Sequence, residues 1–290
     1  MSENNQDRRR AARERLQRER ELEKRREKRR RTLIVASAVV GVLGLAAVVG
    51  LIAANAGKDG GDGTDAGPVV APAGAEGEEQ LAIPVGAPDA PSTLTVWEDF
   101  RCPACAAFEN TLRDTIHDMT EQGQLKVEYR LATIIDGNLG GNGSKRAANA
   151  AACAQDAGHF AAYHDVLFED QPPETDDAYA DNDKLIELAG KVEGLDTPAF
   201  RQCVQDGTYS AWVNESNQAF QDGGFRGTPT VLLNGESIFP QKGDEQISVE
   251  NFKKWVAEAN EGKQPGTEAP ASPTRSPSPA DTGSPAPTGS

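Results

Sequence analysis

Two cysteines separated by two residues lie where a predicted strand meets a predicted helix, and no other feature constrains the fold so strongly. Residues 93–99 have the composition of a strand, and residues 103–121 carry apolar side chains at helical spacing. Cys102 therefore precedes the helix, and Cys105 falls in its first turn. The unpaired amides and the dipole of a helix amino terminus lower the pKa of a thiol placed there, and a thiolate is the reactive species in disulfide exchange. We expect Cys102 to be an exposed catalytic cysteine and Cys105 to be its shielded resolving partner.

Zinc binding is the main alternative for such a pair. A structural zinc site needs additional cysteines or histidines at short spacing. The remaining candidates do not supply that spacing, since Cys153 and Cys203 are 50 residues apart and the histidines are scattered at His117, His159 and His164. The sequence therefore predicts redox chemistry, with no metal ligands and no cofactor.

Charge is divided unevenly along the chain. Residues 1–31 contain 14 basic and 7 acidic residues, whereas the remaining residues contain 16 basic and 38 acidic ones. The acidic part would repel a polyanion, which argues against nucleic-acid binding. Residues 33–54 follow the basic segment, carry no charge and are long enough to span a hydrocarbon core as a helix. We therefore expect a transmembrane helix with a cytoplasmic amino terminus and an extracytoplasmic catalytic domain.

A cleaved signal peptide is the alternative for the apolar segment, because Ala54, Asn55 and Ala56 resemble a small-residue cleavage site. The length of the basic and apolar segments favours an uncleaved anchor. The sequence predicts a basic cytoplasmic segment (1–32), a transmembrane helix (33–54) and a flexible linker (55–80). One folded domain (81–262) follows, with a helical insertion at about 141–223, and a disordered tail rich in Pro, Ser and Thr (263–290) ends the chain.

Periodicity and turn signals predict the order of elements inside the folded domain. Strands are expected at 81–85, 93–99, 124–134, 230–233 and 237–239, with a tight turn at Asn234 and Gly235. Helices are expected at 103–121, 144–157, 159–168, 183–192, 198–207, 208–220 and 249–259, with Ser144 and Ser248 as caps, and 169–183 is expected to be a solvated loop. The order is strand, helix, strand, a block of helices, and then a hairpin and a helix.

This arrangement resembles the DsbA-like thiol–disulfide oxidoreductases of the thioredoxin superfamily. The resemblance rests on three features: the helical block, the segment Phe100-Arg101-Cys102-Pro103-Ala104-Cys105, and the segment Gly227-Thr228-Pro229-Thr230. It implies an α/β thioredoxin-like fold with an inserted helical domain. It also implies that Pro229 has a cis peptide bond, faces the active site and, with Thr228, binds the substrate chain.

Two positions depart from the pattern of that family. Ala104 stands where a histidine often helps to hold the thiolate, so the resemblance implies weaker oxidising power. Val96 stands where thioredoxin-like proteins often bury a carboxylate that accepts a proton. Glu98 shares the strand face of Val96 and is a possible substitute, although an exposed acid at the strand end is the interpretation that we favour for it.

The other two cysteines, Cys153 and Cys203, fall on predicted helices of the insertion. A second redox pair is one interpretation, and a structural disulfide is the other. Phe200, Cys203 and Val204 share one helix face, which predicts a buried Cys203. Their wide separation and the oxidising compartment expected for the domain favour the structural disulfide.

These features together predict an enzyme that introduces disulfide bonds into exported proteins through Cys102 and Cys105. The family resemblance implies a membrane quinone-linked partner, of DsbB or vitamin K epoxide reductase type, that reoxidises the pair. Two alternatives remain open at the level of sequence. One is a membrane-tethered thiol reductase of the same fold, and the other is a non-catalytic binding module in which the cysteine pair is a structural disulfide.

Overall fold

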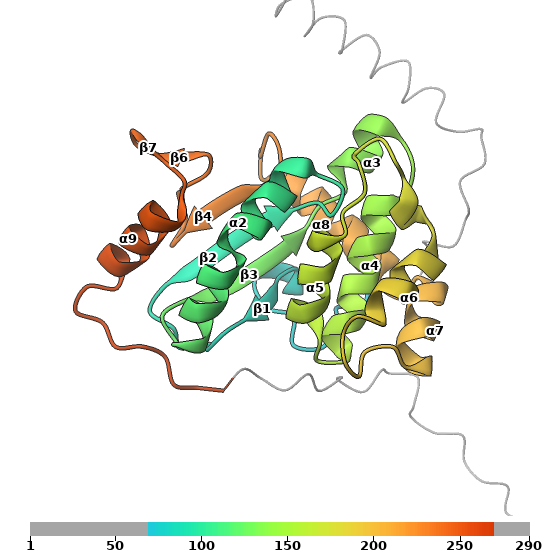
Figure 1. Ribbon diagram of the computed structural model, residues 1–290, viewed down its shortest axis with the longest axis horizontal. Helices are drawn as coiled ribbons and strands as arrows, with labels where there is room; N and C mark the ends of the chain where they lie inside the picture. Colours follow the sequence, from blue (N-terminus) through green and yellow to red (C-terminus); the bar gives the residue numbers. More distant parts are fainter. Residues whose placement is uncertain (1–68, 270–290) are drawn as a thin grey trace, which may run out of the picture. The chain divides into compact units, whose positions relative to one another are not determined.

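The computed structural model describes residues 69–269 (Figure 1). A five-stranded sheet with the order β1-β3-β2-β4-β5 forms its centre. Its strands are β1 (Ile83–Val85), β2 (Thr93–Glu98), β3 (Lys126–Leu131), β4 (Thr230–Leu233) and β5 (Glu236–Ser237). Strands β2 and β3 run parallel with Leu94 opposite Val127, and the other neighbours run antiparallel. This is the thioredoxin-like α/β fold expected from the sequence.

Helix α2 (Pro103–Glu121) follows β2 and has the predicted bounds. Its apolar stripe of Phe108, Leu112, Ile116 and Met119 is buried, as its spacing predicts. Helix α9 (Val249–Ala259) contacts α2 and begins at the predicted cap, where Ser248 accepts a hydrogen bond from the amide of Asn251. Along β3, buried side chains alternate with half-buried ones, because successive residues of a strand point to opposite faces of the sheet.

The insertion consists of α3 (Ile134–Leu139), α4 (Gly143–Asp156), α5 (Phe160–Glu169), a 3-10 turn η2 (Ala178–Ala180), α6 (Asn182–Ala189), α7 (Pro198–Asp206) and α8 (Ser210–Asp222). Helices α4 to α7 lie together at one side of the sheet, and α9 lies at the opposite side (Figure 1). The predicted start and end of α7 are confirmed: Thr197 caps it and Gly207 ends it with a φ of 62°. The three tryptophans are buried, as expected of core residues: Trp97, Trp212 and Trp255.

Several local predictions need correction. The strand expected at 124–134 ends at Leu131, and Ile134 instead begins the unpredicted helix α3. Ser144 does not cap α4 but lies inside it, since the helix begins at Gly143. The carboxylate of Asp136 accepts the amide of Ser144 and so takes the role expected of a capping side chain. The loop expected at 169–183 contains η2, and Tyr179 within it is buried. A short hairpin of β6 (Gln241–Lys242) and β7 (Glu245–Gln246) was also missed.

Both segments that flank the domain are ordered beyond their predicted limits. In the linker, the amide of Ala73 donates to Asp156 and the indole of Trp212 donates to the carbonyl of Gln80. In the tail, Gly266 donates to the carbonyl of Gly123, and Thr267 donates to Asp89. These contacts place the boundaries of the folded domain outside the predicted limits of 81 and 262.

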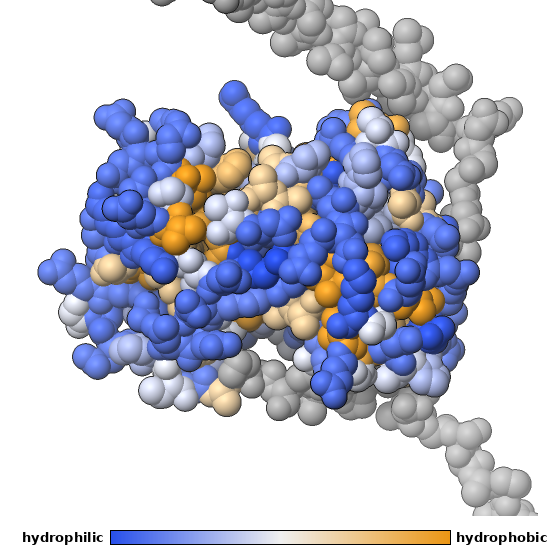
Figure 2. Space-filling model, viewed as in Figure 1, coloured by the Kyte–Doolittle hydropathy of each residue, from blue (hydrophilic) through white to orange (hydrophobic). Residues whose placement is uncertain are grey.

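The segments 1–32 and 33–54 lie outside the described residues. Among residues 69–269, no helix is long and apolar enough to cross a membrane. Hydrophilic residues cover most of the molecular face in Figure 2, in keeping with 30 acidic and 13 basic residues over 81–262.

Candidate active site

Cys102 is the residue that caps the amino terminus of α2, with extended backbone angles and with Pro103 as the first helical residue. The turn before it is held by Asp99, whose carboxylate accepts the amide of Arg101 at 2.8 Å. The side chain of Cys102 is not exposed as expected, because only 7% of the residue is accessible. Its position at the helix terminus is the one that the sequence predicts, but the residue is nearly buried.

The Cys102 thiol has a pKa lowered to about 6. The largest cause is a hydrogen bond from the Cys105 side chain, which stabilises the thiolate; burial opposes it. The side chain of Thr228 and the backbone amides of Cys105 and Ala104 lower the pKa further. The helix amino terminus therefore contributes as the sequence predicts, but the second cysteine contributes more.

Cys105 is fully buried, and burial raises the pKa of its thiol well above the usual value. The neighbouring Cys102 raises it as well, through the hydrogen bond and through its charge. The two thiols are free, and their pKa values are shifted in opposite directions. Cys102 carries the negative charge of the reduced pair, and Cys105 carries the proton.

The Thr228–Pro229 peptide bond is cis, and it immediately precedes β4. The sulfur of Cys102 lies 3.3 Å from the carbonyl oxygen of Thr228. The structure thus brings Thr228 and Pro229 to Cys102 across 126 residues of sequence. This is the placement that the family resemblance implies for the two residues.

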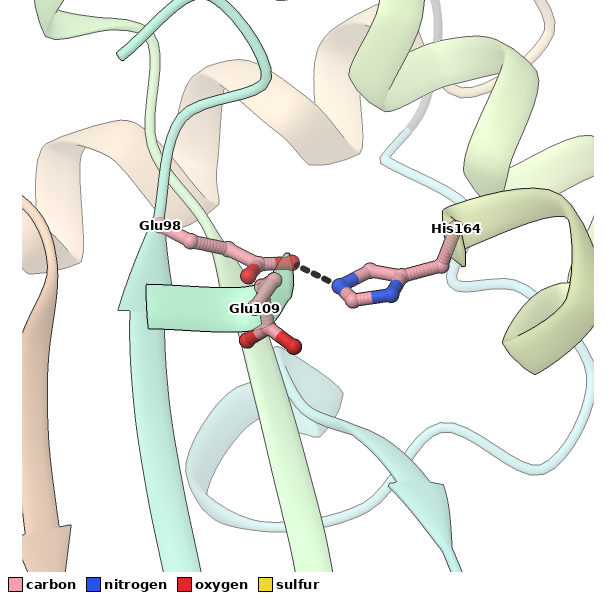
Figure 3. Close-up of side chains that lie close together, drawn as sticks. All are labelled: Glu98, Glu109 and His164. Atoms are coloured by element: carbon pink, nitrogen blue, oxygen red, sulfur yellow. Dashed lines mark hydrogen bonds and ion pairs between the residues drawn. The ribbon is translucent and has the colours of Figure 1, made fainter. Parts of the chain in front are cut away.

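Glu98 is completely buried, so the favoured interpretation of it as an exposed strand-end acid is wrong. Its carboxylate Oε1 lies 2.8 Å from Nε2 of His164, which α5 supplies from the insertion. The carboxyl group of Glu109 lies beside this pair, and the three side chains converge from β2, α2 and α5 (Figure 3). Glu109 is only 2% exposed, although carboxylate side chains are rarely buried.

Burial and charge determine how protons are held in this acid–histidine cluster of Glu98, Glu109 and His164. Burial opposes a charged His164, but Glu98, Asp165 and Glu109 outweigh it and raise the histidine pKa to about 10. Burial raises the pKa of Glu109 to about 8. These shifts favour the imidazolium form of His164, which donates to Glu98, and the protonated form of Glu109.

The same cluster is a set of potential metal ligands that sequence reasoning missed. One ligand atom from each of the three residues lies within 4.8 Å of the others. The residues are 11 and 66 positions from Glu98, so no short-spacing motif could have found them. One signal was available for Glu109, which follows Cys105 by four residues and therefore shares its side of the helix.

Cys153 of α4 and Cys203 of α7 are joined by a disulfide, which is the pairing expected from the sequence. Cys153 is 2% exposed, whereas Cys203 is half-buried rather than buried as predicted. Neither sulfur belongs to the Cys102–Cys105 pair. The disulfide connects two helices of the insertion and has the position of a structural crosslink.

Comparison with known proteins agrees with this fold. A model of the thioredoxin family matches residues 78–258. Disulfide bond formation protein D of Bacillus subtilis strain 168 is 26% identical over 157 residues, which are 53% of this chain and 68% of that protein.

Two solved structures from Mycobacterium tuberculosis are similar. The reduced disulfide bond oxidoreductase DsbG matches with a TM-score of 0.54 and 26% identity, covering 63% of this chain and 89% of the other. Reduced DsbA matches with a TM-score of 0.54 and 26% identity, covering 64% and 95%. The chain therefore belongs to the thioredoxin family and is a DsbA-like thiol–disulfide oxidoreductase.

Proposed function

We propose that the protein introduces disulfide bonds into exported proteins, with Cys102 as the catalytic cysteine and Cys105 as its partner. The observation that carries this proposal is the opposite shift of the two thiol pKa values. A stabilised Cys102 thiolate favours the reduced form of the pair, and a pair whose reduced form is favoured is a stronger oxidant.

In the proposed reaction, a substrate thiolate attacks the Cys102 sulfur of the Cys102–Cys105 disulfide. The disulfide breaks, a mixed disulfide forms at Cys102, and Cys105 leaves with the electron pair and takes up a proton. A second substrate thiolate then attacks the substrate sulfur of the mixed disulfide. Cys102 leaves as a thiolate, the substrate gains a disulfide, and the enzyme pair has accepted two electrons.

Glu98 is proposed to serve this reaction through the acid–histidine cluster rather than alone. Cys105 is buried, so the proton that it takes up must come from a buried group or a narrow path. Glu109 lies one helical turn after Cys105 and holds a proton near neutral pH, and the charge of Glu98 acts on Cys105 directly. We assign Glu109 as the proton donor and Glu98 as the carboxylate that, with His164, balances the charge when the proton moves.

Substrate binding is assigned to Thr228 and Pro229, because their peptide lies against Cys102. The apolar segment 33–54, flanked by basic residues on one side, supports a single-pass anchor with the domain outside the cytoplasm. In that location a membrane quinone-linked protein, of DsbB or vitamin K epoxide reductase type, would return the pair to its disulfide form. The acidic surface gives some preference for basic clients.

A reductase is the second candidate, and Ala104 is the observation that favours it, because the position lacks a histidine that would stabilise the thiolate. Oxidation of a reduced, unfolded model protein by the oxidised full-length chain separates the two. We expect rapid formation of substrate disulfides with wild type and none with Cys102→Ser. If the reduced chain instead cleaves disulfides of the model protein faster than the oxidised chain forms them, the oxidase proposal is refuted.

A further inference from the structure

Residues 171–177, here called the clamp segment, connect α5 to η2 and contact the active-site backbone from the insertion. The side-chain amide of Gln171 donates to the carbonyl of Phe100 at 2.9 Å and to the carbonyl of Cys102 at 3.0 Å. One side chain thus binds the chain on both sides of Arg101. Since 69 residues separate Gln171 from Cys102, the insertion provides this contact by tertiary folding.

The clamp segment also holds Arg101, whose side chain is 2% exposed. Its guanidinium donates to the carbonyl of Glu174 at 3.1 Å and forms an ion pair with Asp177 at 2.8 Å. Asp136 of α3 adds a second ion pair at 2.6 Å. The residue directly before Cys102 is therefore fixed by its side chain, while Gln171 fixes the backbone around it.

Asp177 extends this fixation to the start of α4, because it also accepts the amides of Asn142 and Gly143. The approach is close: a Cβ at Gly141 or Gly143 would lie 2.1 or 2.4 Å from oxygens of Asp177. The glycines at the start of α4 thus permit a tight junction. They do not form the flexible connection that their composition suggests.

The Cys102 carbonyl is a shared acceptor in this arrangement. It accepts the amides of Cys105 and Ala106 as well as the Gln171 side chain. The position of this carbonyl therefore fixes the first turn of α2, and it also fixes the direction of the amide N–H groups that stabilise the Cys102 thiolate. A neutral amide that donates to this carbonyl also withdraws negative partial charge from the neighbourhood of the sulfur.

We propose that Gln171 is a positioning residue for Cys102, through which the helical insertion determines how strongly the Cys102–Cys105 pair oxidises its substrate. Gln171 touches neither sulfur and acts through the two carbonyls that it holds. The inference rests on the redox role of the pair in the proposed function, but not on export, membrane anchoring or the identity of clients.

The test compares Gln171→Ala with Gln155→Ala in the full-length protein. Gln155 is the control, since its side-chain amide likewise donates to the backbone, to the single carbonyl of Ala73 at 2.9 Å, away from the active site. Two quantities are measured. The first is the Cys102 pKa, obtained from the ultraviolet absorbance of the thiolate as the pH is varied, and the second is the equilibrium constant of the pair with glutathione. We expect Gln171→Ala to raise the Cys102 pKa and to weaken oxidation of glutathione about two- to tenfold, the range for one hydrogen bond. Gln155→Ala should leave both values at those of wild type.

Gln171→Asn provides a second variant, because it keeps the amide but is one methylene shorter and cannot hold both carbonyls in place. It should shift both readouts in the same direction as Gln171→Ala. Wild-type values in both Gln171 variants would overturn the proposal, as would an equal shift in Gln155→Ala. If wild type itself fails to oxidise glutathione, the oxidase proposal is refuted, whereas the Cys102 pKa still decides the role of Gln171.

Discussion

Replacing Cys153 and Cys203 together with alanine removes the disulfide between α4 and α7 and should lower stability without abolishing redox chemistry. The crosslink closes a loop of 50 residues. Loop-closure entropy for that separation corresponds to about 4 kcal/mol, an upper figure because residual structure in the unfolded chain reduces it. For a domain of this size, about 4 kcal/mol corresponds to a fall in Tm of about 8–16 °C.

The assay is thermal unfolding of wild type and of the double variant in oxidising buffer, together with thiol oxidation at low temperature. Cys102→Ala/Cys105→Ala is the matched control, because it also removes two sulfurs, but the disulfide that it removes closes no long loop. We expect it to melt close to wild type and to lack activity, whereas the Cys153→Ala/Cys203→Ala variant should keep its activity. A Tm unchanged by loss of the Cys153–Cys203 disulfide, or loss of oxidation at low temperature, would refute the assignment as a structural crosslink.

Three further results follow from the active-site geometry. Alkylation of reduced protein should modify Cys102 before Cys105, with a rate that rises around pH 6, and equal labelling of both thiols would contradict their division of charge. Cys105→Ser should accumulate mixed disulfides with exported proteins on non-reducing gels; their absence from cells that express the variant would count against the proposed clients. Glu109→Gln should slow reduction of the oxidised pair by a substrate dithiol. Burial raises the Glu109 pKa from its ordinary value to about 8, so wild type should lose stability as the pH rises from that ordinary value to about 8. Glu109→Gln should lose less stability over the same pH range, as chemical unfolding at several pH values would reveal.

Local signals in the sequence were sufficient for much of the fold. The bounds of α2 follow from Pro103 and from apolar spacing, and those of α7 follow from Thr197 and Gly207. The turn after β4 follows from Asn234 and Gly235, both of which have positive φ. In each case the determining residues lie within one turn of the feature that they specify.

The predictions that failed concern contacts made across long sequence separations. Glu98 looked exposed because its partner, His164, is 66 residues away on another helix. The Asp136 carboxylate replaces Ser144 as the partner of the amides that begin α4, which no local pattern reveals. Gln171 was assigned to a solvated loop because its acidic neighbours dominate the composition there, whereas its side chain binds the active-site backbone.

The reduction potential of the Cys102–Cys105 pair, measured by equilibration of the full-length protein with glutathione, tests the central claim most directly. Thioredoxin-type reductants lie near about −270 mV, and strong DsbA-type oxidants lie near about −120 mV. The stabilised Cys102 thiolate and the absence of a histidine at Ala104 together predict a value above about −220 mV but below the strongest oxidants. A value close to that of thioredoxin would contradict the assignment as a disulfide-forming enzyme and would favour the reductase.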